Sequence, residues 1–364
     1  MKKIMNVVGA RPNFMKIGPI QREMNRRNSE FQPVLVHTGQ HYDEKMSKLF
    51  FDDLQLPKPD VYLGVGSGTH AEQTAKIMID FEKVCIEQKP DMVLVVGDVN
   101  STVACSLVAS KLWIPVIHVE AGLRSFDRKM PEEINRLVTD SLADYLFITE
   151  KAGIENLKNE GVDDAKVHFV GNVMIDSLAF FLEKARESDI LKRLELREKN
   201  YALVTLHRPS NVDDPENFLK ILAAFEQIEK EIPIVFPIHP RTRKNIERFG
   251  LEDRVKALKN LKLLPPIGYL DFMNLTQNCK FVMTDSGGIQ EETTYLGIPC
   301  MTLRENTERP ITIEVGTNEL VGPNTEQILN YAQKMLSGQW KKGAVPELWD
   351  GHAAERIVEV LAGA

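Results

Sequence analysis

The sequence predicts an α/β protein made of two doubly wound domains, each a parallel β-sheet covered by helices. Its 364 residues suit two domains better than one, because a domain usually holds about 150 residues. Short apolar segments alternate with longer amphipathic ones through both halves of the chain. That alternation is typical of buried parallel strands joined by helices, and right-handed crossovers make two doubly wound units the simplest topology.

The expected strands are the short apolar runs. They cover residues 4–8, 34–37, 92–96, 116–119 and 145–148 in the first half and 202–206, 234–238, 281–284 and 300–303 in the second. The expected helices cover residues 16–26, 69–86, 102–112, 131–142, 173–186, 216–231, 241–249, 270–277, 289–296, 325–336 and 352–361.

The domain break is expected between residues 172 and 200, where a charge-dense stretch at 184–200 has few apolar positions. Such a composition suits a hinge between two domains. We therefore expect an N-terminal domain at 1–171 and a C-terminal domain at 172–351. The last helix need not pack on the domain that precedes it.

Composition and charge exclude several classes of protein. The chain is 43% hydrophobic and 27% charged, which excludes global disorder. No apolar run approaches the roughly 18 residues of a membrane span, and the apolar segment after Met1 lacks a cleavage pattern. The formal net charge of −7, without a dense Lys/Arg run, argues against nucleic-acid and membrane partners. We expect a cytoplasmic protein.

The four cysteines, Cys85, Cys105, Cys279 and Cys300, are far apart and lie in apolar contexts. They show neither CxxC spacing nor a nearby histidine, so neither a metal site nor a disulfide framework is indicated. We expect four buried thiols and no metal.

Cationic and polar residues follow the first expected strand in the segment GARPNFMK at 9–16. The segment is neither GxGxxG nor a P-loop, so it indicates no dinucleotide cofactor. Arg11 and Lys16 stand near a helix start, which suits a phosphate. The alternative is a surface turn whose cations face solvent.

Carboxylates follow two further strands and begin a helix in the first half. Asp98, in GDVNST, either caps the next helix or presents a carboxylate to a ligand. In HVEAGLRS, strand alternation puts His118 and Glu120 on one side, where burial would be costly without partners. Glu132, in MPEEINR, has the position of an ordinary helix-start acid. Together these acids suit proton transfer on a sugar ring.

The second half carries an anion-binding motif, TDSGGIQEE at 284–292. A strand, a hydroxyl, two glycines and then a helix would gather backbone N–H groups at Ser286, Gly287 and Gly288 and favour a pyrophosphate. Glu292 lies about one turn further on, where it could accept hydrogen bonds from sugar hydroxyls. His207, in TLHR, follows another strand and could also meet a phosphate. The combination suggests two domains facing one another across a cleft.

The motifs GARPNFMK, GDVNST, HVEAGLRS, MPEEINR, TLHR, TDSGGIQEE and NTERP, in this order, resemble those of the non-hydrolysing UDP-N-acetylglucosamine 2-epimerases. The likeness runs over nearly the whole chain. It implies the GT-B architecture, two Rossmann-like domains with the C-terminal helix (352–364) crossing back to the first. It also implies a UDP-sugar substrate, no cofactor and a homodimer.

The resemblance also implies roles for individual residues. Arg11 and Lys16 are similar to a cationic pair at the substrate mouth, and Phe272 to an aromatic residue bordering the uracil pocket. The implied substrate-binding residues are Arg11, Lys16, Phe272, Ser286, Gly287, Gly288, Glu292 and Arg309. The implied catalytic residues are Asp98, Glu120, Glu132 and His207.

The implied reaction inverts C2 of the GlcNAc ring and gives UDP-ManNAc without NAD. Elimination of UDP would leave a glycal, to which UDP re-adds. The segments at 38–43 and 239–243 also resemble enzymes that act on UDP-2,3-diacetamido-glucuronate, but TERP at 307–310 favours UDP-GlcNAc. A GT-B glycosyltransferase and a sugar-nucleotide sensor are the rival functions, and the three carboxylates argue against the sensor.

The sequence departs from this family at two places. Ile267 stands where many bacterial members carry a glutamine five residues before the phenylalanine, so a uracil contact there would use backbone. Gln40 and His41 match ligands of members activated by a second UDP-GlcNAc, whereas Asp43 and Ser67-Gly68 do not. We therefore expect no such activation.

Overall fold

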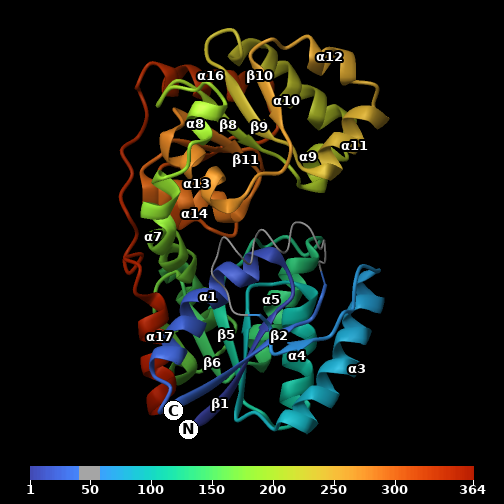
Figure 1. The fold of residues 1–364 in the computed structure, drawn as a ribbon, viewed down its shortest axis with the longest axis vertical. Helices are drawn as coiled ribbons and strands as arrows, with labels where there is room; N and C mark the ends of the chain where they lie inside the picture. The colour runs from blue at the N-terminus through green and yellow to red at the C-terminus, as the bar shows by residue number, and fades with distance from the viewer. Residues whose placement is uncertain (41–57) are drawn as a thin grey trace. The chain divides into compact units, whose positions relative to one another are not determined.

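The computed structural model describes residues 1–40 and 58–364, and the chain forms two compact units. The first unit contains Met1–Phe180 together with Glu347–Ala364, and the second contains Phe181–Pro346. Each unit holds one parallel β-sheet with flanking helices (Figure 1). The predicted fold class, two doubly wound α/β units, is confirmed.

The sheet of the first unit has β1 near its centre, where Asn6 pairs with Leu35 on one side and Leu94 on the other. All of its neighbouring strands run parallel. In spatial order the strands are β3 (Val61–Tyr62), β2 (Phe31–His37), β1 (Lys2–Val8), β4 (Met92–Val96), β5 (Val116–Ala121), β6 (Tyr145–Ile148) and β7 (Val167–Phe169).

Helices lie on both faces of this sheet, with α1 and α17 on one and α3 and α4 on the other (Figure 1). The helices of the first unit are α1 (Arg11–Arg26), α3 (His70–Gln88), α4 (Asn100–Lys111), α5 (Pro131–Leu142), α6 (Lys151–Asn159) and α17 (Ala353–Gly363). The boundary between the units falls within α7 (Val173–Arg186).

The final helix, α17, packs against α1 in the first unit. Lys2 Nζ donates hydrogen bonds to the carbonyls of Leu361 (2.9 Å) and Ala362 (3.0 Å), the last turn of α17. Asp176 of α7 accepts hydrogen bonds from the backbone N–H groups of Ala353 (3.1 Å) and Ala354 (2.7 Å). Both ends of α17 are therefore tied to the first unit.

The sheet of the second unit is also parallel throughout. In spatial order its strands are β10 (Leu261–Leu264), β9 (Ile234–Pro237), β8 (Ala202–Thr205), β11 (Phe281–Thr284), β12 (Cys300–Thr302) and β13 (Asn318–Leu320). Its helices are α8 (Ile190–Arg193), α9 (Pro209–Val212), α10 (Pro215–Ile228), α11 (Pro240–Arg248), α12 (Glu252–Lys256), α13 (Tyr269–Asn278), α14 (Gly287–Leu296), α15 (Ile311–Glu314) and α16 (Thr325–Leu336).

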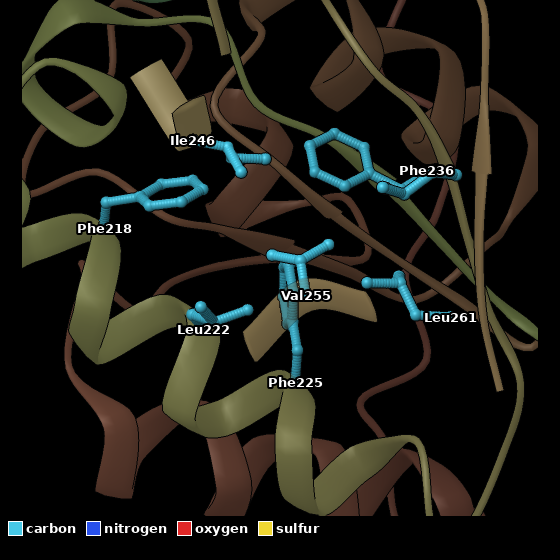
Figure 2. Close-up of a pocket in the computed structure, with 8 residues that line it drawn as sticks. Phe218, Leu222, Phe225, Phe236, Ile246, Val255 and Leu261 are labelled. Carbon is cyan, nitrogen blue, oxygen red and sulfur yellow. The ribbon is translucent and has the colours of Figure 1, made fainter. Parts of the chain in front are cut away.

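Both faces of the second sheet are buried. Ala202 and Val204 of β8 belong to the core that includes α10 and α16, whereas Leu203 belongs to the core that includes Leu275 of α13. The first of these cores encloses an apolar cavity of about 10 Å³, lined by side chains such as those of Phe218, Phe225 and Phe236 (Figure 2). A cavity of that size holds at most one water molecule, so it is a packing defect and no ligand site.

The strands that the sequence did not predict are the edge strands of the two sheets. β3, β7, β10 and β13 are two to four residues long, and most of their side chains are only half-buried. A half-buried short strand carries no continuous apolar run, so the signal that identified the central strands is missing. The four cysteines are buried and free, as predicted. Within residues 1–40 and 58–364, no helix is long and apolar enough to cross a membrane.

Candidate active site

Most candidate site residues of the first unit lie where β1, β4 and β5 end, whereas Glu132 lies in the first turn of α5. These three strands are neighbours in the sheet, so the loops at their carboxyl ends meet at one edge, the usual ligand-binding edge of such sheets. Asn13 of α1 fixes two of these loops together. Its Oδ1 accepts hydrogen bonds from the N–H groups of Gly9 (3.1 Å) and Ala10 (2.9 Å), and its Nδ2 donates to the carbonyl of Val96 (3.1 Å).

Lys16 and Glu120 form a buried ion pair at this edge. A β-carbon built on Gly97 would lie 3.0 Å from Lys16 Nζ, so the ammonium group also approaches the loop that carries Asp98. A buried charge pair of this kind is costly to break, because removing either partner leaves the other charge uncompensated. The structure thus brings three predicted site residues, Lys16, Asp98 and Glu120, to one region of the first unit.

Glu120 has an unusual backbone conformation. Its φ angle is 73°, in the left-handed region, and the pairing of β5 with β6 shifts register between Val119 and Ala121. The regular strand alternation that predicted a shared side for His118 and Glu120 is interrupted by this bulge. A non-glycine residue is rarely found in this conformation except where the surrounding structure enforces it, as it often does in active sites.

His118 is completely buried and has partners on both ring nitrogens. Its Nδ1 lies 2.6 Å from Oδ1 of Asp140, and its Nε2 donates to the carbonyl of Gly97 at 2.9 Å. Burial alone would raise the pKa of Asp140, but the charges and hydrogen bonds of His118 and Arg124 hold that pKa below its ordinary value. The partner that a buried strand histidine requires is therefore Asp140, which the sequence did not reveal.

Asp98 does not cap α4. The residue before α4 is Val99, and no side chain caps the helix. Asp98 instead forms an ion pair with Arg136 of α5, and its backbone carbonyl accepts a hydrogen bond from Asn135 Nδ2 at 2.8 Å. Arg136 also pairs with Glu133 at 2.6 Å. The loop that carries Asp98 is thus held by α5.

Glu132 and Glu133 differ in environment although they are adjacent. Glu132 is half-buried in the first turn of α5. Glu133 is buried, and its carboxylate accepts hydrogen bonds from the N–H groups of Ser125 (3.0 Å) and Phe126 (2.9 Å). Burial would raise the pKa of Glu133, but the Ser125 N–H group and Arg136 outweigh burial and lower it. Sequence reasoning did not single out Glu133, although its spacing of three residues from Arg136 is a pairing signal.

In the second unit, Asp285 organises the loop that carries His207. Asp285 follows β11 and is buried; it accepts hydrogen bonds from the N–H groups of His207 (3.0 Å) and Arg208 (2.9 Å). Oδ1 of Asp285 lies 3.0 Å from Nδ1 of His207, whose side chain is 40% exposed. Burial would raise the pKa of Asp285, but its hydrogen bonds and charge interaction with His207 lower it. The His207 ring is therefore oriented by a buried anion and open to a ligand.

Ser286, Gly287 and Gly288 lie at the start of α14, as the sequence predicts. Ser286 precedes the helix, and the first turn carries no acidic residue. The N–H group of Ser286 donates to Thr284 Oγ1 at 2.9 Å. The N–H groups of a helix N-terminus are electrostatically suited to an anion, and here the guanidinium of Arg309 and the carboxylate of Glu308 both lie beside Gly287. Glu292, one turn further along α14, is buried, and Oε1 accepts a hydrogen bond from the Tyr269 hydroxyl at 3.5 Å.

Arg309 is buried beside the start of α14 within a network of charged groups. Its Nε lies 2.7 Å from Glu291 Oε1, and its Nη1 donates to Glu308 Oε1 at 2.6 Å. Glu308 also accepts a hydrogen bond from Arg304 Nη2 at 2.8 Å. Sequence reasoning selected Arg309 but neither of its two carboxylate partners.

The structure shows the positions of Arg11, Phe272 and Gln40, whereas other predicted residues lie outside the described part of the chain. Arg11 is the first residue of α1, and Phe272 lies in α13, packed against the core that includes Leu275. Gln40 Oε1 accepts hydrogen bonds from the N–H group (3.0 Å) and hydroxyl (2.6 Å) of Ser101. His41 and Asp43 lie outside the described residues.

The chain is similar over its whole length to known epimerases. A family model described as UDP-N-acetylglucosamine 2-epimerase matches residues 22–362. The UDP-N-acetylglucosamine 2-epimerase of Methanocaldococcus jannaschii is 44% identical over 366 residues, covering 99% of this chain and 98% of that protein. The UDP-2,3-diacetamido-2,3-dideoxy-D-glucuronate 2-epimerase of Pseudomonas aeruginosa is 41% identical over 363 residues, covering 99% of each.

The structure is also similar to solved structures of UDP-GlcNAc 2-epimerases. The crystal structure of the M. jannaschii UDP-GlcNAc 2-epimerase in complex with UDP-GlcNAc and UDP superimposes with a TM-score of 0.91 at 43% identity, covering 100% of both chains. This likeness confirms the fold class that the resemblance implied, two Rossmann-like domains of the GT-B type, and the expected enzyme class, an isomerase. The chain belongs to the UDP-N-acetylglucosamine 2-epimerase family.

Proposed function

We propose that this chain interconverts UDP-GlcNAc and UDP-ManNAc by eliminating UDP and adding it back through a glycal. The observation that carries this proposal is the buried Lys16–Glu120 pair beside the loop of Asp98. It places carboxylates that can exchange protons, together with a cation, at the ligand-binding edge of one sheet. The relative from M. jannaschii, which was crystallised with UDP-GlcNAc and UDP, supports the choice of substrate.

The chemistry explains why several acid–base groups are needed. The proton on C2 of the sugar is not acidic enough for direct removal. When the C1–O bond breaks, its electron pair leaves with UDP and C1 becomes oxocarbenium-like, so a base can take the C2 proton and form the C1=C2 bond. In the return step the UDP oxygen attacks C1 and a proton adds to the opposite face of C2. Two faces require two proton-transfer groups, for which Asp98, Glu120 and Glu132 are the candidates.

The second unit would bind the nucleotide. The start of α14, from Ser286 to Gly288, and the half-exposed His207 would stabilise the diphosphate as it leaves, since fixed donors are most effective where charge develops. Arg309 would contribute from beside Gly287. Glu292 would bind the ribose and Phe272 would border the uracil. Arg11 and Lys16 of the first unit complete the proposed set.

The experiment that tests this function is incubation with UDP-GlcNAc in D2O, followed by NMR at C2. Epimerisation places deuterium at C2 as UDP-ManNAc accumulates. Release of UDP only when an acceptor is added would instead indicate a glycosyltransferase, and an unchanged spectrum would indicate a binding protein.

A second candidate substrate is UDP-2,3-diacetamido-2,3-dideoxyglucuronate. The 41% identity to the P. aeruginosa enzyme of that name supports it. A glucuronate carries an extra carboxylate, so this candidate requires a cation near C6 of the sugar. Measuring kcat/KM for both nucleotide sugars decides between them, and we expect the higher value for UDP-GlcNAc.

We further propose that the enzyme is a cytoplasmic homodimer that supplies polysaccharide biosynthesis. The support for this is the family resemblance. Light scattering on the purified protein tests the dimer, with twice the chain mass of 41.2 kDa expected.

A further inference from the structure

The carboxylate of Asp140 holds β5 on both sides of Glu120. Oδ1 of Asp140 is 2.6 Å from Nδ1 of His118, and Oδ2 accepts a hydrogen bond from the N–H group of Gly122 at 3.0 Å. His118 stands two residues before Glu120 in the chain and Gly122 stands two residues after it. Both ends of the bulged segment are therefore attached to one side chain, which is itself buried.

The residue between the two attachments has the left-handed backbone. A φ of 73° at Glu120 is unfavourable for a residue with a β-carbon, so this conformation persists only while its flanks are held. The register shift between Val119 and Ala121 leaves Glu120 outside the regular ladder of β5 and β6. The regular strand pairing does not hold the backbone at Glu120, whereas the side chain of Asp140 holds the residues on either side of it.

The same carboxylate reaches the second candidate acid through His118. Nε2 of His118 donates to the carbonyl of Gly97 at 2.9 Å, and Gly97 directly precedes Asp98. Arg124 secures Asp140 from another direction: its Nη2 lies 2.7 Å from Asp140 Oδ2 and 2.7 Å from Glu160 Oε2. Asp140 is thus the centre of a network that contacts the segment carrying Glu120 twice and reaches the loop of Asp98 through His118.

We propose that Asp140 is a positioning residue that fixes the carboxylates of Glu120 and Asp98 relative to one another and thereby sets the rate of proton transfer. This inference rests on the proposed function, because Glu120 and Asp98 are its assigned acid–base groups. Asp140 is itself buried, and its carboxylate contacts His118, Gly122 and Arg124. A displacement of a reacting group by about 1 Å can cost on the order of 100-fold in rate, so loss of this network is expected to act on turnover.

The test compares Asp140→Asn with a matched control, Asp144→Asn. An asparagine keeps the shape of Asp140 but replaces one accepting oxygen by an NH2 group, which only donates. One oxygen then remains, whereas Asp140 uses Oδ1 toward His118 and Oδ2 toward Gly122. Asp144 also binds β5, but at the opposite end, where its Oδ2 accepts from the N–H group of Val116 at 2.9 Å. The control removes a carboxylate contact from the same strand without reaching Glu120.

We expect Asp140→Asn to lower kcat about 100-fold with KM and UDP affinity near the wild-type values, because nucleotide recognition is assigned to the second unit. Asp144→Asn should keep kcat. The folded fraction of each variant is measured by circular dichroism and thermal melting, so that kcat refers to folded enzyme only. A merely structural role would lower the melting temperature and the folded fraction but leave kcat per folded molecule unchanged.

His118→Gln provides a second variant for the case in which Asp140→Asn does not fold. Its amide can donate to Asp140 but cannot also reach the carbonyl of Gly97, so kcat should again fall at unchanged KM. Wild-type enzyme that fails to epimerise UDP-GlcNAc would overturn the proposed function, and this inference with it. Active wild-type enzyme together with a folded variant of full kcat would overturn the role of Asp140 alone.

Discussion

Arg309 occupies the space that a side chain on Gly287 would need. A β-carbon built on Gly287 would lie 2.7 Å from Nη1 of Arg309 and 2.9 Å from Oε1 of Glu308. Gly287→Val should therefore displace the guanidinium as well as crowd the start of α14. We expect UDP affinity to fall, and calorimetry with UDP measures it. Unchanged affinity in the folded variant would place the diphosphate elsewhere.

Gly297→Ala is the matched control for that substitution. Gly297 ends the same helix, α14, with a φ of 66°, and a β-carbon there meets no atom within 4 Å. Its left-handed backbone should cost about 1 kcal/mol of stability, whereas UDP affinity should stay at the wild-type value. Comparing Gly287→Val with Gly297→Ala distinguishes a general loss of stability in α14 from a specific loss of UDP binding.

The three candidate acid–base groups are expected to affect turnover far more than nucleotide binding. Asp98→Asn, Glu120→Gln and Glu132→Gln should each lower kcat by a factor on the order of 10² to 10⁴. UDP affinity should change much less, because these side chains are assigned to the sugar. If all three variants keep near-normal turnover in the NMR assay, the assignment is wrong.

Substitution of Glu132 should mainly lower turnover, whereas substitution of Glu133 should mainly lower the free energy of unfolding. Glu133→Gln weakens the buried contacts of that carboxylate with Ser125, Phe126 and Arg136, so we expect a loss of about 3 kcal/mol in the free energy of unfolding. Glu132→Gln should lower kcat with a much smaller change in stability. Urea unfolding and initial rates on both variants check this, and the reverse pattern would exchange the two roles.

Asp176 should make stability depend on pH. Burial raises its pKa to about 6, although the N–H groups of Ala354 and Ala353 oppose that rise. Between about pH 4 and pH 6 the folded state keeps a proton that the unfolded state releases, so this group's stabilising contribution is lost as pH rises through that window. Relative to wild type, Asp176→Asn should gain up to about 3 kcal/mol between pH 4 and pH 7. Parallel curves from urea unfolding at these pH values would contradict the assignment.

The reverse reaction should need no activator. Asp43 and Ser67-Gly68 depart from the ligands of activated members, and the side-chain oxygen of Gln40 is already hydrogen-bonded to Ser101. We expect hyperbolic kinetics on UDP-ManNAc freed of its epimer. A long lag that traces of UDP-GlcNAc abolish would show that an activating site exists.

The central strands and the motif positions could be predicted because each depends on local sequence. β4, β6 and β11 match the expected ranges, since a buried parallel strand is a continuous apolar run. The interactions that organise the candidate site could not be predicted, because they join residues far apart in the chain. Asp140 meets His118 from 22 residues away, and Asp285 meets His207 from 78 residues away.

The backbone at Glu120 shows a second limit of the sequence. A motif such as HVEAG marks a histidine and a glutamate, and strand alternation then assigns their sides. Glu120 departs from that alternation because of its bulge, and the sequence carries no local sign of it, since glutamate does not favour a positive φ. The strand was predicted correctly, but the bulge at Glu120 was not.

The inclusion of Glu347–Ala364 in the first unit sets an order for folding during synthesis. A ribosome releases residues 1–180 early, but α17 is still missing from them, and with it the groups that bind Lys2 and Asp176. Phe181–Pro346 is continuous, so the second unit has all of its residues before the first unit does. The first unit therefore cannot form all of its contacts until the second unit has been synthesised, whereas an N-terminal domain usually finishes first. Until α17 has been synthesised, the side of α1 that packs against it lacks its partner.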